Sequence, residues 1–271
     1  MTQAAPVVVA SIRPLQLLAA ALTDGISTPI VVMAPGQDPH HLSLRPADRR
    51  ALEQADIVLW VGPALEQPLE KVVATSGKVI ITAQTLKGIQ LITDDNVVDP
   101  HLWLDVANTR VIAAALLEAL RQRDAANAVR YQANAERFSL QLDQLNNELK
   151  TALQPWQRQP WAVSHQAFRY FARQYGLQEP TALTDSNNAA PGVQRVLQLR
   201  ERISRQGITC LITEPSENHQ QLDSMLDNKL VSVVTADAMG TALNPAADAY
   251  IALLRQVGVA LQQCLGGSQH G

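Results

Sequence analysis

The sequence predicts an α/β protein of two lobes, each with a parallel-type sheet flanked by helices, joined by one long rigid helix. Short β-branched runs alternate with helical patterns in the first third of the chain, at residues 7–10, 30–33, 57–61 and 79–81. The same alternation returns later, with strand candidates at 161–164, 208–212 and 231–234. Because parallel strands need helical crossovers, this alternation indicates two successive α/β lobes.

A long segment without glycine or proline separates the two sets of strands, from about Asp124 to Gln154. Apolar side chains recur within it at helical spacing, and Pro155 ends it. A helix of roughly 30 residues is about 45 Å long, enough to connect two lobes. We therefore expect an N-terminal lobe at 1–123, a connecting helix at 124–154 and a C-terminal lobe at 155–271. A long surface helix within one domain is the alternative.

Composition and charge exclude several classes of partner. The formal net charge is -3 and no cluster of Lys or Arg stands out, which argues against nucleic acid. No apolar stretch reaches the roughly 18 residues of a membrane span. The opening residues run almost directly into an apolar strand without a recognisable export signal, as expected if that signal had been removed.

The two cysteines, Cys210 and Cys264, are open to two interpretations. They are either two buried thiols or one disulfide. A disulfide would join the last helix to a central strand, and it would persist only in an oxidising compartment.

Three of the six histidines occupy equivalent places in the predicted topology. His40 comes just after the second predicted strand, His101 stands in a turn before a helix, and His165 directly ends a strand. Asp237 follows the strand at 231–236 in the same way. Ligands of open parallel sheets bind at the carboxyl ends of the strands, and three imidazoles with one carboxylate suit Zn²⁺. Taken singly, each histidine could equally be a surface or capping residue.

Carboxylates accompany these histidines. The tripeptide Asp-Pro-His occurs at 38–40 and again at 99–101, where proline restricts its own φ and the residue before it. Asp38, Asp99 and Glu214 are candidates to accept the second N–H of a ligating imidazole. A helix cap or a solvated charge is an equally good interpretation of each.

Four segments together resemble the zinc-uptake periplasmic receptors of the ZnuA type, within the metal-binding class of ABC solute receptors. The resemblance covers nearly the whole chain and implies two α/β lobes, one long linking helix and a metal held between the lobes. The segments that carry it are 39–48 with 55–63, His101–Asp105, Ser164–Phe171 and Thr235–Gly240.

The resemblance also implies roles for individual residues. The family's first ligand corresponds to His40, which leaves His41 as a supporting or surface residue. Manganese-carrying relatives generally have glutamate at the position of His165, so the imidazole favours zinc. Some zinc receptors have glutamate where this chain has Pro39, so the fourth ligand is Asp237 or water, and we expect Asp237.

Two further features of such receptors can be compared with this chain. The positions of Cys210 and Cys264 match a disulfide of the zinc-specific members, so the resemblance implies that these residues are bonded. The histidine-rich loop that many members insert before the second ligand is absent, since residues 84–100 contain no histidine.

The expected function is that of a non-enzymatic, monomeric periplasmic receptor. It would capture Zn²⁺ as cargo in the cleft between the lobes and deliver it to the ABC permease of a zinc importer in the inner membrane. A receptor for manganese or iron is the alternative within the same class. A zinc hydrolase would need a water in the fourth position, which Asp237 would fill, and no general base is evident.

Overall fold

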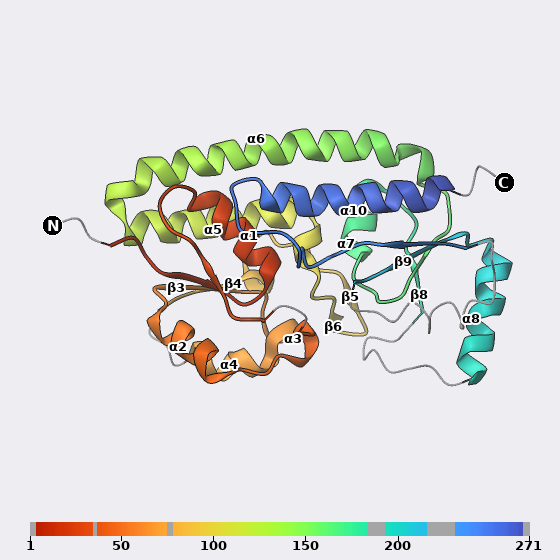
Figure 1. The fold of residues 1–271 in the computed structure, drawn as a ribbon, viewed down its shortest axis with the longest axis horizontal. Coiled ribbons are helices and arrows are strands. Elements are labelled where there is room, and N and C mark those ends of the chain that lie inside the picture. The colour runs from red at the N-terminus through yellow and green to blue at the C-terminus, as the bar shows by residue number, and fades with distance from the viewer. Residues whose placement is uncertain (1–3, 35–36, 75–77, 184–192, 216–230, 268–271) are drawn as a thin grey trace. The chain divides into compact units, whose positions relative to one another are not determined.

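The structure is a computed structural model that describes residues 4–34, 37–74, 78–183, 193–215 and 231–267 (Figure 1). The chain forms two compact units. Unit 1 comprises Met1–Leu145 with Met239–Leu253, and unit 2 comprises Asn146–Ala238 with Leu254–Gly271. Two helices, α6 (Ala128–Leu153) and α10 (Ala249–Gly266), contribute residues to both units.

Unit 1 contains a four-stranded parallel sheet in the order β2-β1-β3-β4. Its strands β1 and β3 are buried along their whole length, which explains why they read as unbroken apolar runs. Val9 in β1 pairs with Ile30 on one side and Val58 on the other. The strands are β1 (Val8–Ala10), β2 (Ile30–Val31), β3 (Ile57–Trp60) and β4 (Val79–Thr82).

Helices cover both faces of this sheet. Figure 1 shows α1 (Arg13–Leu22) and α5 (Val106–Arg123) on one side, where α1 contacts β1 and α5 contacts β4. The other side carries three short helices, α2 (Pro46–Gln54), α3 (Pro63–Glu66) and α4 (Glu70–Ala74). Each of α1, α2 and α3 begins with proline in its first turn, the position that tolerates the missing N–H.

Unit 2 contains a second four-stranded parallel sheet, in the order β10-β9-β7-β8. Its helices include α7 (Arg169–Tyr175) and α8 (Val193–Gln206). The edge strand β8 does not follow from the apolar pattern, because it is two residues long and only half buried. The strands are β7 (Ala162–Val163), β8 (Thr181–Ala182), β9 (Cys210–Thr213) and β10 (Ser232–Thr235).

The predicted α/β class with parallel sheets and a long helix is confirmed. The helix α6 begins at Ala128 because Asp124 caps a preceding 3₁₀ helix, Ala125–Asn127, by accepting from the backbone N–H of Asn127. The segments 1–123, 124–154 and 155–271 stay a prediction about domain organisation. Within the described part of the chain, no helix combines the length and apolar character needed to cross a membrane.

A small β-hairpin in unit 1 was not predicted. It pairs β5 (Thr93–Asp94) with β6 (Val97–Val98), and both turn residues, Asp95 and Asn96, have positive φ, as a two-residue hairpin turn requires. The backbone N–H of Asp99 donates to the carbonyl of Ile92 at 2.9 Å. The hairpin therefore closes directly before the second Asp-Pro-His sequence.

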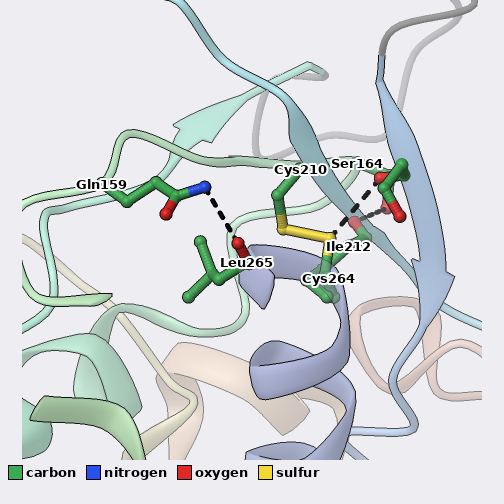
Figure 2. Close-up of a disulfide and its surroundings, with 7 residues drawn as sticks. Gln159, Ser164, Cys210, Ile212, Cys264 and Leu265 are labelled. Carbon is green, nitrogen blue, oxygen red and sulfur yellow. Dashed lines mark hydrogen bonds between the residues drawn. A yellow bond between two sulfur atoms is a disulfide. The ribbon is translucent and has the colours of Figure 1, made fainter. Parts of the chain in front are cut away.

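The disulfide between Cys210 and Cys264 is confirmed (Figure 2). It joins the first residue of β9 to the last turn of α10 across a Cα–Cα distance of 5.2 Å. The side chain of Gln159 donates to the carbonyl of Leu265 at 3.0 Å beside it. The end of α10 is thus held to the rest of unit 2 by this covalent bond and this hydrogen bond.

Candidate metal centre

His40 lies in a short 3₁₀ helix, Pro39–His41, that follows β2 in unit 1. Asp38 caps this helix, since its Oδ1 accepts from the backbone N–H of His40 at 2.9 Å. The helix α3 packs against the same turn. Asp38 therefore caps this helix, and its predicted role beside an imidazole stays a prediction.

The chain after His40 is secured at the start of α2. Arg45 and Asp48 form a bidentate ion pair there, with Nη2 to Oδ1 at 2.7 Å and Nε to Oδ2 at 2.9 Å. The hydrogen bonds from Arg45 lower the pKa of the Asp48 carboxyl below its usual range. The segment between the 3₁₀ helix and α2 therefore lies between two local capping interactions.

His101 lies beside His40, with ring centroids 5.4 Å apart. Its Nδ1 is 2.8 Å from Oδ1 of Asp99, and the same oxygen accepts from the backbone N–H of His101 at 3.0 Å. Both side chains are only 6% exposed. Asp99 thus orients the imidazole, and because the carboxylate engages Nδ1, the remaining coordinating nitrogen is Nε2.

The candidate residues of unit 2 lie at the carboxyl ends of neighbouring strands. His165 follows β7 and Glu214 follows β9, and their Nδ1 and Oε2 are 3.1 Å apart. The histidine is 7% exposed and the glutamate 18%. Asp237 follows β10, the next strand of the sheet, and is partly buried. His165 therefore has the same carboxylate support at Nδ1 as His101.

The predicted site residues thus fall into two described groups. His40, His101 and Asp99 come together in unit 1, and His165 and Glu214 come together in unit 2. The side chain of His41 and the whole of His219 lie outside the described residues. The complete ligand set of His40, His101, His165 and Asp237 stays a prediction.

Sequence reasoning missed Glu66, a fully buried carboxyl at the end of α3. It accepts hydrogen bonds from the hydroxyl of Ser11 and from the backbone N–H groups of Gly62, at 3.0 Å, and Val61, at 3.4 Å. Burial raises the pKa of Glu66 to about 7. The sequence signal was a Gly-Pro helix start followed by an acidic residue in the first turn.

Comparison with known proteins identifies related sequences over nearly the whole chain. The sequence matches the family described as "Zinc-uptake complex component A periplasmic" (ZnuA) over residues 8–264. It is 26% identical to the high-affinity zinc uptake system protein ZnuA of Brucella abortus, covering 95% of this chain and 91% of that protein. The corresponding protein of Paracoccus denitrificans is 29% identical, with coverages of 96% and 92%.

A crystal structure of ZnuA has the same fold. The two chains superpose with a TM-score of 0.83 at 24% sequence identity, covering 97% of this chain and 98% of the other. This likeness agrees with the α/β architecture described above.

Proposed function

Because this chain belongs to the ZnuA family of periplasmic zinc-uptake components, we propose that it is a periplasmic solute-binding protein that captures Zn²⁺ as cargo. It delivers the ion to an ABC importer, whose inner-membrane permease is its partner. The relatives of Brucella and Paracoccus, named for high-affinity zinc uptake, support this assignment.

The observation that carries the proposal is the pairing of two histidines with carboxylates. Asp99 engages Nδ1 of His101, and Glu214 engages Nδ1 of His165. Histidines that bind metals almost always have their second nitrogen hydrogen-bonded in this way, because the bond fixes the tautomer and raises the basicity of the ligating nitrogen. Two histidines that each have a carboxylate at Nδ1 are expected if both bind the same ion.

We propose that a single Zn²⁺ is bound by the imidazoles of His40, His101 and His165 and by the carboxylate of Asp237. Three nitrogen donors and one oxygen donor fit tetrahedral zinc, whereas manganese prefers more oxygen donors. In this arrangement the segments 1–123 and 155–271 each supply two ligands, and the helix at 124–154 connects them. His41 supplies none.

This ligand set also separates a receptor from an enzyme. Catalytic zinc sites keep one position open for water, whereas four protein ligands fill the tetrahedral shell. We therefore propose a non-enzymatic, monomeric receptor. A manganese or iron receptor remains the alternative within the class, and the competition experiment below distinguishes it.

Zinc affinity of single variants tests the proposal. Zn²⁺ is titrated against a chelator of known affinity in the presence of the wild-type protein and of His40→Ala, His101→Ala, His165→Ala and Asp237→Ala. Each histidine variant should lose affinity by about 100-fold or more, because an ion deprived of one donor loses a coordination bond.

Two substitutions serve as controls. His41→Ala and His219→Ala change imidazoles outside the proposed shell and should alter the affinity by less than about threefold. If His41→Ala lost as much zinc affinity as His40→Ala, the assignment of His40 rather than His41 as the first ligand would be wrong. Displacement of Zn²⁺ by Mn²⁺ at comparable concentration would overturn the assignment of the cargo.

A further inference from the structure

Two buried hydroxyl groups in unit 1 hold the segment that follows His101. Tyr250 lies at the start of α10 and Thr109 in the first turn of α5, and both are fully buried. The hydroxyl of Tyr250 donates to the carbonyl of Trp103 and lies 2.8 Å from Oγ1 of Thr109. Oγ1 of Thr109 lies 2.8 Å from the carbonyl of Asp105. The two hydroxyls therefore secure two carbonyls within four residues of His101.

Trp103 connects the hydroxyls of Tyr250 and Thr109 with the imidazole of His101. The ring of Trp103 contacts the ring of His101, with centroids 5.3 Å apart. Trp103 belongs to the 3₁₀ helix Leu102–Leu104, whose last N–H donates to the carbonyl of His101 at 3.2 Å. Two neighbours in the chain thus contact the imidazole of His101: Asp99, which precedes it, and Trp103, which follows it.

The orientation of Tyr250 is itself fixed. Its ring packs edge-on against Phe138 of α6, with centroids 5.8 Å apart. Burial raises the pKa of the Tyr250 hydroxyl, so this group stays protonated and remains a donor throughout the neutral range. A phenylalanine would fill nearly the same volume, but it would leave the carbonyl of Trp103 without this donor.

We propose that Tyr250, acting with Thr109, is a positioning residue that sets the zinc affinity of His101. This inference rests on the proposed function. The physical reason is preorganisation: a ligand held in its bound orientation loses less freedom when the ion arrives, and a displaced imidazole binds more weakly.

The test compares Tyr250→Phe and Thr109→Val, singly and together. Each single variant should raise the dissociation constant for Zn²⁺ about fivefold, measured by chelator competition. The double variant should be little worse than either single variant, because both substitutions disrupt one shared network and their effects are then not additive. Co²⁺ bound in place of Zn²⁺ should show an altered visible absorption spectrum in the same variants, reporting a changed ligand geometry.

Tyr131→Phe is the matched control. Tyr131 is also a fully buried tyrosine of unit 1, and its hydroxyl donates at 3.0 Å to Asp124, the residue that caps the 3₁₀ helix before α6. Its loss should lower the melting temperature of the metal-free protein about as much as Tyr250→Phe does. The dissociation constant for Zn²⁺ and the Co²⁺ spectrum should stay those of the wild type.

The outcomes separate the two proposals. If the wild type binds Zn²⁺ tightly and Tyr250→Phe changes only the melting temperature, Tyr250 is a structural residue and the positioning role is wrong. If the wild type itself fails to bind Zn²⁺, the proposed function fails and the positioning role with it. Should Tyr250→Phe not fold, Thr109→Val decides the question by the same measurements.

Discussion

Single residues at the candidate centre act through carboxylates that hold imidazoles in place. Asp99 accepts two hydrogen bonds from His101 while both side chains are almost completely buried, and Glu214 contacts Nδ1 of His165. A buried carboxylate at this position is stabilised by the two hydrogen bonds that its Oδ1 accepts. A substitution that preserves the shape of the Asp99 side chain but removes its charge therefore measures how this carboxylate affects metal binding.

Asp99→Asn should weaken Zn²⁺ binding about 10-fold or more, because the neutral amide makes the His101 ligand less basic and holds its ring less firmly. Chelator competition measures the change. Asp143→Asn is the control, since Asp143 is an exposed carboxylate of unit 1 paired with Arg110. Equal affinities for the two variants would mean that Asp99 has no role in metal binding.

Glu66 should make the stability of the protein depend on pH. Its pKa is about 7 in the folded protein against an ordinary value of 4.5, so the folded state binds the proton more tightly than the unfolded state. The contribution of Glu66 to stability is therefore complete below pH 4.5 and is lost as the pH rises through about 7, by roughly 3 kcal/mol in all.

Glu66→Gln cannot titrate and should lose this part of the pH dependence. Urea unfolding of the metal-free wild type and variant between pH 4.5 and 8 checks the prediction. All other titratable groups are the same in both proteins, so the difference between the two curves isolates Glu66. Parallel curves would show that the carboxyl does not keep its proton in the folded state.

The turn between β3 and α3 depends on a glycine. Gly62 has a φ of 136°, and a Cβ atom there would come within 2.4 Å of the side chain of Gln84. Gly62→Ala should therefore cost about 2–4 kcal/mol, since it combines backbone strain with a clash. Denaturant unfolding measures this loss.

Gly207→Ala separates the backbone strain of Gly62→Ala from its steric clash. Gly207 also has a positive φ, 65°, but among the described residues its Cβ would meet no atom within 4 Å. This control should cost only about 1 kcal/mol, the backbone strain alone. The double variant Gly62→Ala with Gln84→Ala should recover the part of the loss that comes from the clash, and failure to recover any would contradict the steric explanation.

The disulfide joins two residues of unit 2 and closes a loop of chain between positions 54 residues apart. Chain entropy alone then contributes about 4 kcal/mol, because the cross-link removes conformations from the unfolded chain. Cys210→Ala with Cys264→Ala should lower the midpoint of denaturant unfolding accordingly. Treatment of the wild type with a strong reductant should reproduce the shift, and a double variant as stable as the oxidised protein would contradict the estimate.

Zinc should stabilise the molecule as a whole if donors from both units bind one ion. A ligand that binds only the folded state adds about 4 kcal/mol when its concentration is 1,000 times the dissociation constant. His101→Ala in unit 1 and His165→Ala in unit 2 should each remove most of the zinc-induced rise in melting temperature. A rise lost only in His101→Ala would indicate an ion bound by unit 1 alone.

The α/β class, the long helix and the positions of the candidate ligands could be predicted from the sequence, for a local physical reason. Strands buried on both faces read as apolar runs, α6 reads as an uninterrupted helical repeat, and residues after parallel strands meet at one edge of a sheet. The fold class and the long helix were accessible because each signal lies within a few neighbouring residues, whereas the ligand set stays a prediction.

Only the tertiary structure decided which distant groups meet. Glu66 depends on the hydroxyl of Ser11, 55 residues earlier, and Tyr250 reaches the carbonyl of Trp103 across 147 residues. The Gly-Pro helix start before Glu66 does not indicate its contact with Ser11, and nothing local indicates the contact of Tyr250. The strand β8 and the β5–β6 hairpin are too short for a periodic signal. Burial and hydrogen bonding are properties of the packed chain, so the contacts of Glu66 and Tyr250 became visible only once the elements were assembled.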